Sequence, residues 1–420
     1  MEYNIITKSI IDNLENPIAL EQLYQSDKKR FIHSFEEVNK KFSHHLSVQI
    51  WHERLNRKSD GIGLTIKKED VLFLGVASII AGFIAKIPNL FGLIEDEYYA
   101  RNFSFIVAPF LVIFFSRKNH LALKQIAIPL ILIFLSALYI NILPKIESNN
   151  SLILACIHLP IFLWAVIGYT FIGGDIKNNS LKIDYLKFNG DFLVMIALLV
   201  LAGGIFSGIT LGLFNLIEVK IEEFYFNYVA IWGLSSIPLI ATYLVQTNPS
   251  LVNKISPVIA KIFTPLVFIT VLAFLITLLY TGKNIYSDRN FLLIFNVLLI
   301  GVMAIILFSV TEATKNESNK MIVLTLFMLS TLTVVVNGIA LSAILFRLSE
   351  FGITPNRVAV LGANLLIFIN LVLVSLKLYQ VVSKKESVEK VGLIIAGFIP
   401  YYSIWAFLVT FLFPILFQYK

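Results

Sequence analysis

The sequence predicts an all-α, polytopic transmembrane helical bundle of about eleven spans, preceded by a small N-terminal helical cytoplasmic region. Of the 420 residues, 57% are hydrophobic and only 15% are charged, whereas a soluble domain is about half apolar and a quarter charged. Apolar runs repeatedly approach or exceed the ~18 residues that a helix needs to cross the hydrocarbon core. The first 68 residues are, by contrast, polar and charged, so they form a separate region and carry no cleavable signal peptide.

Residues 1–68 are predicted to form the helical cytoplasmic region. Three stretches place apolar side chains at helical spacing: Ile6 to Leu14, Leu20 to Val38, and Leu46 to Leu55. Pro17 separates the first two stretches and stands at a favoured first helical position. Because about 68 residues is small for an independent core, we expect this region to pack on itself and on the transmembrane domain, residues 69–420.

Eleven apolar segments are candidate spans in residues 69–420. They cover about 71–87, 103–116, 125–143, 151–172, 192–216, 224–246, 257–281, 290–311, 321–346, 357–380 and 391–416. The first two are the weakest, and the apolar run of the second is short and contains Pro109. A re-entrant second segment is the alternative, and it would reverse the orientation of every later span.

Loop charges predict the orientation. One side carries twelve basic residues: Arg117, Lys118, Lys124, Lys177, Lys182, Lys187, Lys254, Lys315, Lys320, Lys384, Lys385 and Lys390. The other side carries eight: Arg101, Lys145, Lys220, Lys283, Arg289, Arg347, Arg357 and Lys420. Positive charge favours the cytoplasm, so the N-terminus is predicted to be cytoplasmic and the C-terminus external. The net charge of +7 therefore reports orientation, and we predict no nucleic-acid partner.

The external turn between spans nine and ten is a candidate ligand site or structural ion-pair site. Gly352 can adopt positive φ and end span nine, while Thr354 can cap span ten, with a proline following it. Arg357 lies in the first helical turn, where the helix dipole disfavours a cation, and so needs an anionic partner. That partner is Glu350, a lipid phosphate or an anionic ligand. Arg347 shares a helix face with Glu350.

The same turn carries a resemblance. The stretch RLSEFGITPNRV (347–358) resembles the Arg-x-x-x-(Tyr/Phe)-Gly-(Ile/Leu)-Thr-x-x-Arg signature of an uncharacterised bacterial membrane family, catalogued as the domain of unknown function number forty-one fifty-three. Residues 261–296 and 16–35 are also similar to that family. The resemblance implies a multi-pass protein of the bacterial inner membrane, and it implies no substrate.

A second external turn, YTGKNIYSDRN (280–290), joins spans seven and eight. It contains Lys283, Asp288 and Arg289, which are further candidates for a ligand or ion-pair site. Its tyrosines are ordinary interfacial anchors, and Asp288 can cap span eight. Both basic turns are predicted to lie on the external side, where positive charge is normally scarce.

Polar residues inside spans are costly in lipid and are therefore candidates for function. They are His158, Asn296, Asn337, Asn364 and Asn370. For the asparagines, hydrogen bonds between helices are the simpler interpretation. For His158, an interior hydrogen bond is preferred to a metal site, because the sequence shows no further ligands at a suitable spacing.

Span five contains a glycine stripe, Gly204, Gly208 and Gly212, at the four-residue spacing that lets helices approach closely. We predict that it packs on a neighbouring helix, within this chain or in another. We find no phosphate-binding loop, nucleophile elbow, metalloprotease helix or paired intramembrane acids, so no catalytic motif, metal site or cofactor is predicted.

Three interpretations of function stay open, and the third, a membrane-embedded enzyme that acts on lipid-linked substrates, is disfavoured because the loops are short and offer few acids or nucleophiles. The first is transport or flipping of a small solute or a lipid, which the number of spans and the external basic turns favour. The second is a non-enzymatic sensor or assembly partner that binds another protein through residues 1–68. A continuous polar path would favour the first, and a sealed bundle with an exposed apolar groove on the N-terminal region would favour the second. Membrane lipids are expected partners in either case.

Overall fold

The structure is a computed structural model that describes residues 5–26, 28–56, 68–144, 149–216, 219–248, 256–281, 298–306, 309–310 and 320–418. All the regular structure in these residues is helical, which confirms the predicted all-α class. By its internal contacts the chain divides into two compact units, Met1–Thr65 and Ile66–Lys420. Each unit has a hydrophobic core of its own.

The N-terminal unit contains four helices: α1 (Ile5–Asp12), α2 (Pro17–Ser26), α3 (Lys28–Phe42) and α4 (Leu46–Asn56). The second predicted helix is therefore two helices, α2 and α3. Tyr24 of α2 contacts both Phe31 of α3 and Trp51 of α4, with ring centroids 5.5 and 5.3 Å apart. One straight helix could not place Tyr24 against Phe31 in this way, because seven residues of helix extend about 10 Å. Aromatic packing therefore accounts for the bend.

An arginine joins two helices of this unit at its surface. Arg54 of α4 pairs with Glu21 of α2 and lies over the Trp51 ring, with its guanidinium carbon 4.4 Å from the centroid. The hydrogen bond to Glu21 raises the pKa of Arg54. The Trp51 ring covers one face of the Arg54 guanidinium, and Glu21 accepts hydrogen bonds from its N–H groups. Arg54 therefore holds α4 against α2.

Nine helical stretches of the described residues are long and apolar enough to cross a membrane. Eight of them are α5 (Lys68–Phe91), α6 with η1 and α7 (Glu95–Lys118), α8 (Leu123–Ile142), α9 (Asn150–Phe171), α10 (Asn179–Leu216), α11 with η2 and α12 (Glu222–Thr247), α15 (Lys320–Phe351) and α16 (Pro355–Val382). The ninth joins α17 (Val388–Gly397), α18 (Ile399–Phe407), η4 (Leu408–Leu412) and α19 (Phe413–Leu416). The chain is thus a polytopic helical membrane protein.

Two further helical segments lie where spans seven and eight are predicted. They are α13 (Ser256–Thr281) and the described part of 298–310. A total of eleven spans stays a prediction. The weak second run is continuous with the acidic helix α6, so the stretch reaches 24 residues, which is enough to cross. A search for apolar residues alone does not include α6, because a membrane-spanning helix can carry charged residues where it meets the membrane boundary.

The ends of the helices form two opposite faces. At the end where α5 begins, here called the entry face, Asn119 donates hydrogen bonds to the carbonyls of Thr170 and Phe171, each at 2.8 Å. At the opposite end, here called the far face, Asn356 donates to Asn150 Oδ1 at 2.9 Å. The α5 helix begins at the entry face and α19 ends at the far face, as an odd number of spans requires.

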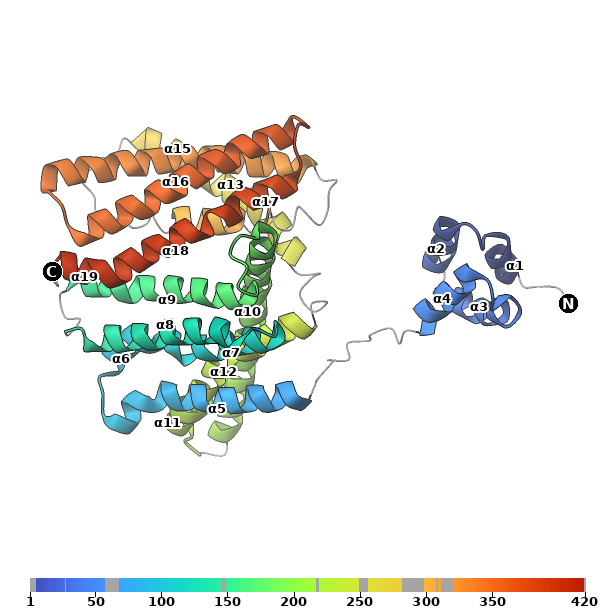
Figure 1. The fold of residues 1–420 in the computed structure, drawn as a ribbon, viewed down its shortest axis with the longest axis horizontal. Helices are drawn as coiled ribbons and strands as arrows, with labels where there is room; N and C mark the ends of the chain where they lie inside the picture. The colour runs from blue at the N-terminus through green and yellow to red at the C-terminus, as the bar shows by residue number, and fades with distance from the viewer. Residues whose placement is uncertain are drawn as a thin grey trace. The chain divides into compact units, whose positions relative to one another are not determined.

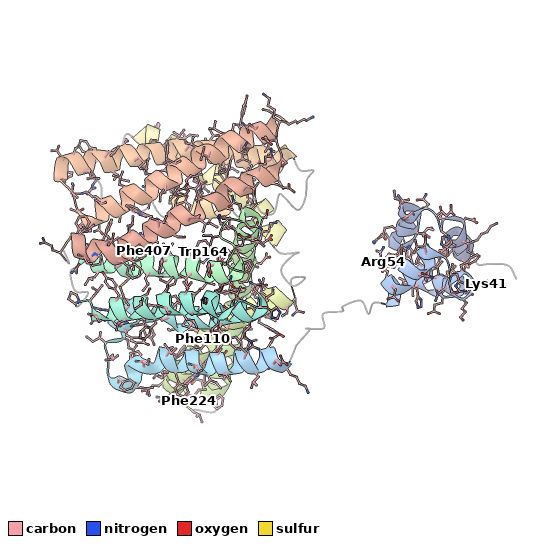
Figure 2. The ribbon with its side chains drawn as sticks, in the orientation of Figure 1. Lys41, Arg54, Phe110, Trp164, Phe224 and Phe407 are labelled. Carbon is pink, nitrogen blue, oxygen red and sulfur yellow. The ribbon has the colours of Figure 1, made fainter. Side chains whose placement is uncertain are left out.

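The helices α5, α8, α9, α16 and α15 lie side by side across the bundle, and α10 runs across them (Figure 1). α9 occupies the centre, where it contacts α7, α8, α16 and α18. Phe407 of α18 packs on Phe162 of α9 with ring centroids 5.7 Å apart (Figure 2). One large apolar core joins α13, α15, α16 and α17. Smaller cores lie among the helices from α5 through α12. Contacts of α17 with α10 and of α18 with α9 connect these two parts.

Two glycines that the sequence analysis did not single out permit the closest helix contacts. A Cβ atom at Gly82 of α5 would lie 2.0 Å from the ring of Trp232, and one at Gly362 of α16 would lie 2.0 Å from the ring of Trp405. Each tryptophan therefore fills the space of a missing side chain on the neighbouring helix. The signal in the sequence is weak, because a lone glycine within a helix does not indicate its partner.

The glycine stripe of α10 does not face a neighbouring helix in the described part of the chain. No heavy atom lies within 4 Å of a Cβ built at Gly204 or Gly208, and both residues are exposed. The surroundings of Gly212 lie outside the described residues. Within the described residues Gly204 and Gly208 therefore meet no neighbouring helix, since spacing alone cannot tell a buried face from a lipid-facing one. Packing against another chain stays a prediction.

Candidate functional site

A cavity of about 350 Å³ lies between α8, α9, α10 and α18. Each helix contributes to its wall, and the lining includes Pro129, Leu132, Ala165, Tyr169, Tyr185 and Ser403. The volume falls within the about 300–1,000 Å³ that is typical of small-molecule sites. The cavity lies in the half of the bundle near the entry face, because Ile172 and Ile176 of the α9–α10 connection also line it.

Aromatic side chains hold α9 and α10 together at the cavity wall. Tyr185 of α10 donates a hydrogen bond to the Trp164 carbonyl at 2.7 Å, and Trp164 Nε1 donates to Asn189 Oδ1 at 2.9 Å. A Cβ at Gly168 would come within 2.7 Å of the Tyr185 ring, so this glycine lets the tyrosine lie flat on α9. These contacts hold the wall rigidly, although the cavity itself is almost entirely apolar.

One cation stands among the lining residues. Lys182 is only 8% exposed, and its ammonium donates to Asn179 Oδ1 at 3.0 Å. No carboxylate of the described residues lies within ion-pair distance of Lys182. It is in the first turn of α10, where Asn178 Oδ1 accepts from the backbone N–H groups of Ser180 and Leu181. The apolar cavity therefore has a basic end at the entry face.

The turn between α15 and α16 has the predicted backbone. α15 ends at Phe351, Gly352 has φ +76°, and Thr354 accepts a hydrogen bond from the Arg357 backbone N–H. The Arg357 guanidinium, however, donates to the carbonyls of Phe351 and Gly352 at 2.7 and 2.6 Å. The predicted ion pair with Glu350 is not among the ion pairs of the described residues. The carbonyls at the negative end of α15 replace it as the partner.

Arg347 lies one helical turn before the end of α15. Its guanidinium carbon is 5.8 Å from the centroid of the Phe351 ring, and Arg357 approaches the same ring at 5.6 Å. Both arginines are partly buried, and Arg347 Nη1 has no hydrogen-bond partner within the described residues. Phe351 thus contacts two cations at the far face. None of these residues lines the cavity described above.

The second predicted turn is not part of the described chain. Lys283, Asp288 and Arg289 lie outside the described residues, and so does Asn296. Their assignment to a ligand or ion-pair site stays a prediction.

The other intramembrane asparagines bond between helices. Asn337 Nδ2 donates to the Asn364 carbonyl at 3.2 Å, which joins α15 to α16. Asn370 Nδ2 donates to Tyr402 Oη at 3.0 Å, which joins α16 to α18. All three asparagines are buried. In the described structure the side-chain oxygens of Asn337 and Asn370 have no partner, and unsatisfied acceptors of this kind cost stability.

His158 interacts with its own helix. Its Nδ1 atom lies 2.9 Å from the Leu154 carbonyl, which is the interior hydrogen bond that we expected. The described residues contain no group of three or more histidine, cysteine or acidic side chains that could hold a metal ion.

Sequence reasoning missed a third arginine at the far face. Arg101 was assigned to a loop, but it lies in α6 and is 7% exposed. It donates to the carbonyls of Ile140, Leu143 and Pro144 at the end of α8, at 2.5 to 2.8 Å, and pairs with Glu97 at 2.9 Å. Arg101 thus binds the end of α8 as Arg357 binds the end of α15. The acidic first turn of α6 is the only hint in the sequence.

Fold and site define the class of this protein: a multi-pass helical membrane protein with an apolar cavity between its helices and a basic group at one end of that cavity. Comparisons of the chain with protein-family models, with curated proteins and with solved structures found no match. The resemblance of residues 347–358 to a bacterial membrane family therefore stays a prediction.

Proposed function

We propose that this protein binds an amphiphilic, lipid-type molecule in the cavity between α8, α9, α10 and α18, and moves it between the leaflets of the membrane. The cavity is the observation that carries the proposal. Its lining is almost entirely apolar, which suits an acyl chain and does not suit a polar solute that must replace its hydration. Of the substrates that transport leaves open, the cavity favours a lipid.

Breaks in the helices near the cavity support a moving element. The α17–α18 stretch is interrupted at Phe398, which precedes Pro400 of the cavity wall. Further along the same stretch η4 is a π-helix whose Phe411 carbonyl accepts a hydrogen bond from Tyr139 of α8 at 2.8 Å. Helix breaks and π-helical turns often occur at functional sites, and these two allow α18 to tilt against α8 and α9.

A vesicle assay tests the proposal. The purified full-length protein is reconstituted into liposomes with a trace of fluorescent phospholipid, and dithionite then bleaches the outer leaflet. We expect the protein to increase the fraction bleached beyond the half found in protein-free liposomes. Ala165→Trp should abolish this increase by filling the cavity, whereas Ala202→Trp, on the exposed face of α10, should retain it. The proposal would be contradicted if wild-type vesicles and protein-free liposomes showed the same bleached fraction.

The N-terminal unit supports a second candidate, that of a partner-binding protein. On α4, Leu46 and Ile50 are 69% and 58% exposed and border a shallow groove with Glu53 and Arg54. Two exposed apolar side chains beside a groove give a binding partner an apolar contact. Leu46→Asp combined with Ile50→Asp should leave lipid movement in vesicles intact but abolish function in cells if this candidate is correct; function retained in cells would exclude it.

A further inference from the structure

We propose that the lipid is anionic and that the ammonium of Lys182 binds its phosphate at the entry face. This proposal rests on the proposed function, because it names the class of lipid that the same cavity takes.

The position of Lys182 carries the inference. Its side chain belongs both to the cavity wall and to the first turn of α10, so Lys182 lies at the end of an otherwise apolar cavity that is nearest the entry face. A chain held in the cavity would therefore bring its headgroup to Lys182. Basic groups between transmembrane helices at a membrane boundary are a known arrangement for anionic lipid headgroups.

Among the described residues, the charge of Lys182 has only a neutral partner. The buried ammonium donates to the Asn179 amide oxygen, and burying a cation without a counter-ion is costly. The nearest acidic residues in sequence are otherwise engaged, since Asp175 accepts from the Lys177 backbone N–H at 3.2 Å and Asp184 lies 3.9 Å from Lys187. An incoming phosphate would supply the missing negative charge.

Two further groups suit a phosphate at this place. Lys182 lies at the N-terminal end of a long helix, where the dipole favours an anion. Tyr169 also lines the cavity, and its hydroxyl lies near the α9–α10 connection, because a Cβ atom at Gly174 would be 3.2 Å from it. A phenol at this position can donate to a headgroup oxygen. Lys182 thus supplies a cation and Tyr169 supplies a hydrogen-bond donor, and both residues line the same apolar cavity.

Headgroup selectivity tests the inference. The full-length protein is delipidated in a mild detergent and mixed with phosphatidylglycerol and phosphatidylcholine of equal chain length, and bound lipid is measured by native mass spectrometry. We expect the wild type to prefer phosphatidylglycerol. Lys182→Gln should reduce this preference about fivefold, as expected for the loss of one interfacial lysine. Lys182→Arg should retain it, as should Lys177→Gln, which removes an exposed lysine of the same loop.

The variants separate the two proposals. A wild type that binds both lipids equally, or a Lys182→Gln variant with unchanged preference, would overturn the headgroup assignment and leave the cavity as a lipid site. Lipid binding that survives Ala165→Trp would instead remove the basis of the proposed function. If Lys182→Gln misfolds, the Lys177→Gln and Lys182→Arg variants still test the headgroup assignment. An ordinary surface-charge effect predicts that Lys177→Gln loses preference for phosphatidylglycerol and that no loss is specific to position 182.

Discussion

Two arginines at the far face, Arg101 and Arg357, each bind the last carbonyls of a neighbouring or preceding helix. A guanidinium has five N–H donors in a fixed plane, and a helix end has several carbonyls without partners. The two groups therefore satisfy each other at the boundary of a membrane domain, where an unpaired carbonyl or an unpaired cation is costly. The arginines therefore act as caps of these helix ends.

The two caps should differ in their effect on stability. Arg101 is almost completely buried and makes hydrogen bonds to three carbonyls and to Glu97, so Arg101→Gln should lower the free energy of unfolding by at least ~2 kcal/mol. Arg357 is more exposed, and Arg357→Gln should cost about 1 kcal/mol or less. Thermal unfolding in detergent would measure both. Equal losses would show that burial does not set the strength of these caps.

Local sequence predicts the backbone of the turn between α15 and α16, but not the contact that Arg357 makes. The positive φ of Gly352 and the cap at Thr354 follow from residue types alone, because turns and helix starts depend on adjacent residues. The partner of Arg357 does not follow, since Glu350, carbonyls and lipid phosphates are all within reach of a flexible side chain. The predicted turn is present, but Arg357 donates to the carbonyls of Phe351 and Gly352 and not to Glu350. Binding of a lipid phosphate or an anionic ligand at Arg357 stays a prediction.

At the scale of elements, close helix contacts depend on single glycines opposite tryptophans. Gly362 receives the Trp405 ring and Gly82 receives the Trp232 ring. The glycine stripe of α10, which has the expected spacing, faces outward instead. Periodicity identifies helices well, but it does not identify which helices become neighbours. For the same reason the cavity could not be predicted, because it requires four helices whose order in space is set by the whole fold.

Gly362→Ala and Gly203→Ala should have opposite effects. At Gly362 the added methyl group would collide with Trp405, and overpacking of this kind costs about 1–3 kcal/mol. Gly203 is exposed on α10 with open space around it, so alanine there should be neutral or stabilising by up to ~1 kcal/mol through helix propensity. Melting temperatures in the same detergent test this. A stabilised Gly362→Ala variant would mean that Trp405 does not occupy the glycine gap.

At the scale of the whole molecule, the chain begins its first span on one face and ends its last helix on the opposite face. The charge bias of the loops assigns the entry face to the cytoplasm. We therefore propose that the protein lies in the bacterial inner membrane with its N-terminus inside.

Reporter fusions at residues 1 and 420 test the topology. A phosphatase fused to the C-terminus should be active only outside the cytoplasm, and a fluorescent protein fused to the N-terminus should fold inside it. We expect both reporters to be active in their respective fusions. Activity of the same compartment marker at both ends would contradict an odd number of spans.

The central claim is that the cavity between α8, α9, α10 and α18 holds one lipid. Native mass spectrometry after extensive detergent exchange measures this most directly, as the number of phospholipids retained per chain. We predict one retained phospholipid for the wild type and for Ala202→Trp, and none for Ala165→Trp with an unchanged melting temperature. Equal retention by Ala165→Trp and the wild type would contradict the claim, and so would a wild-type chain that retains no lipid.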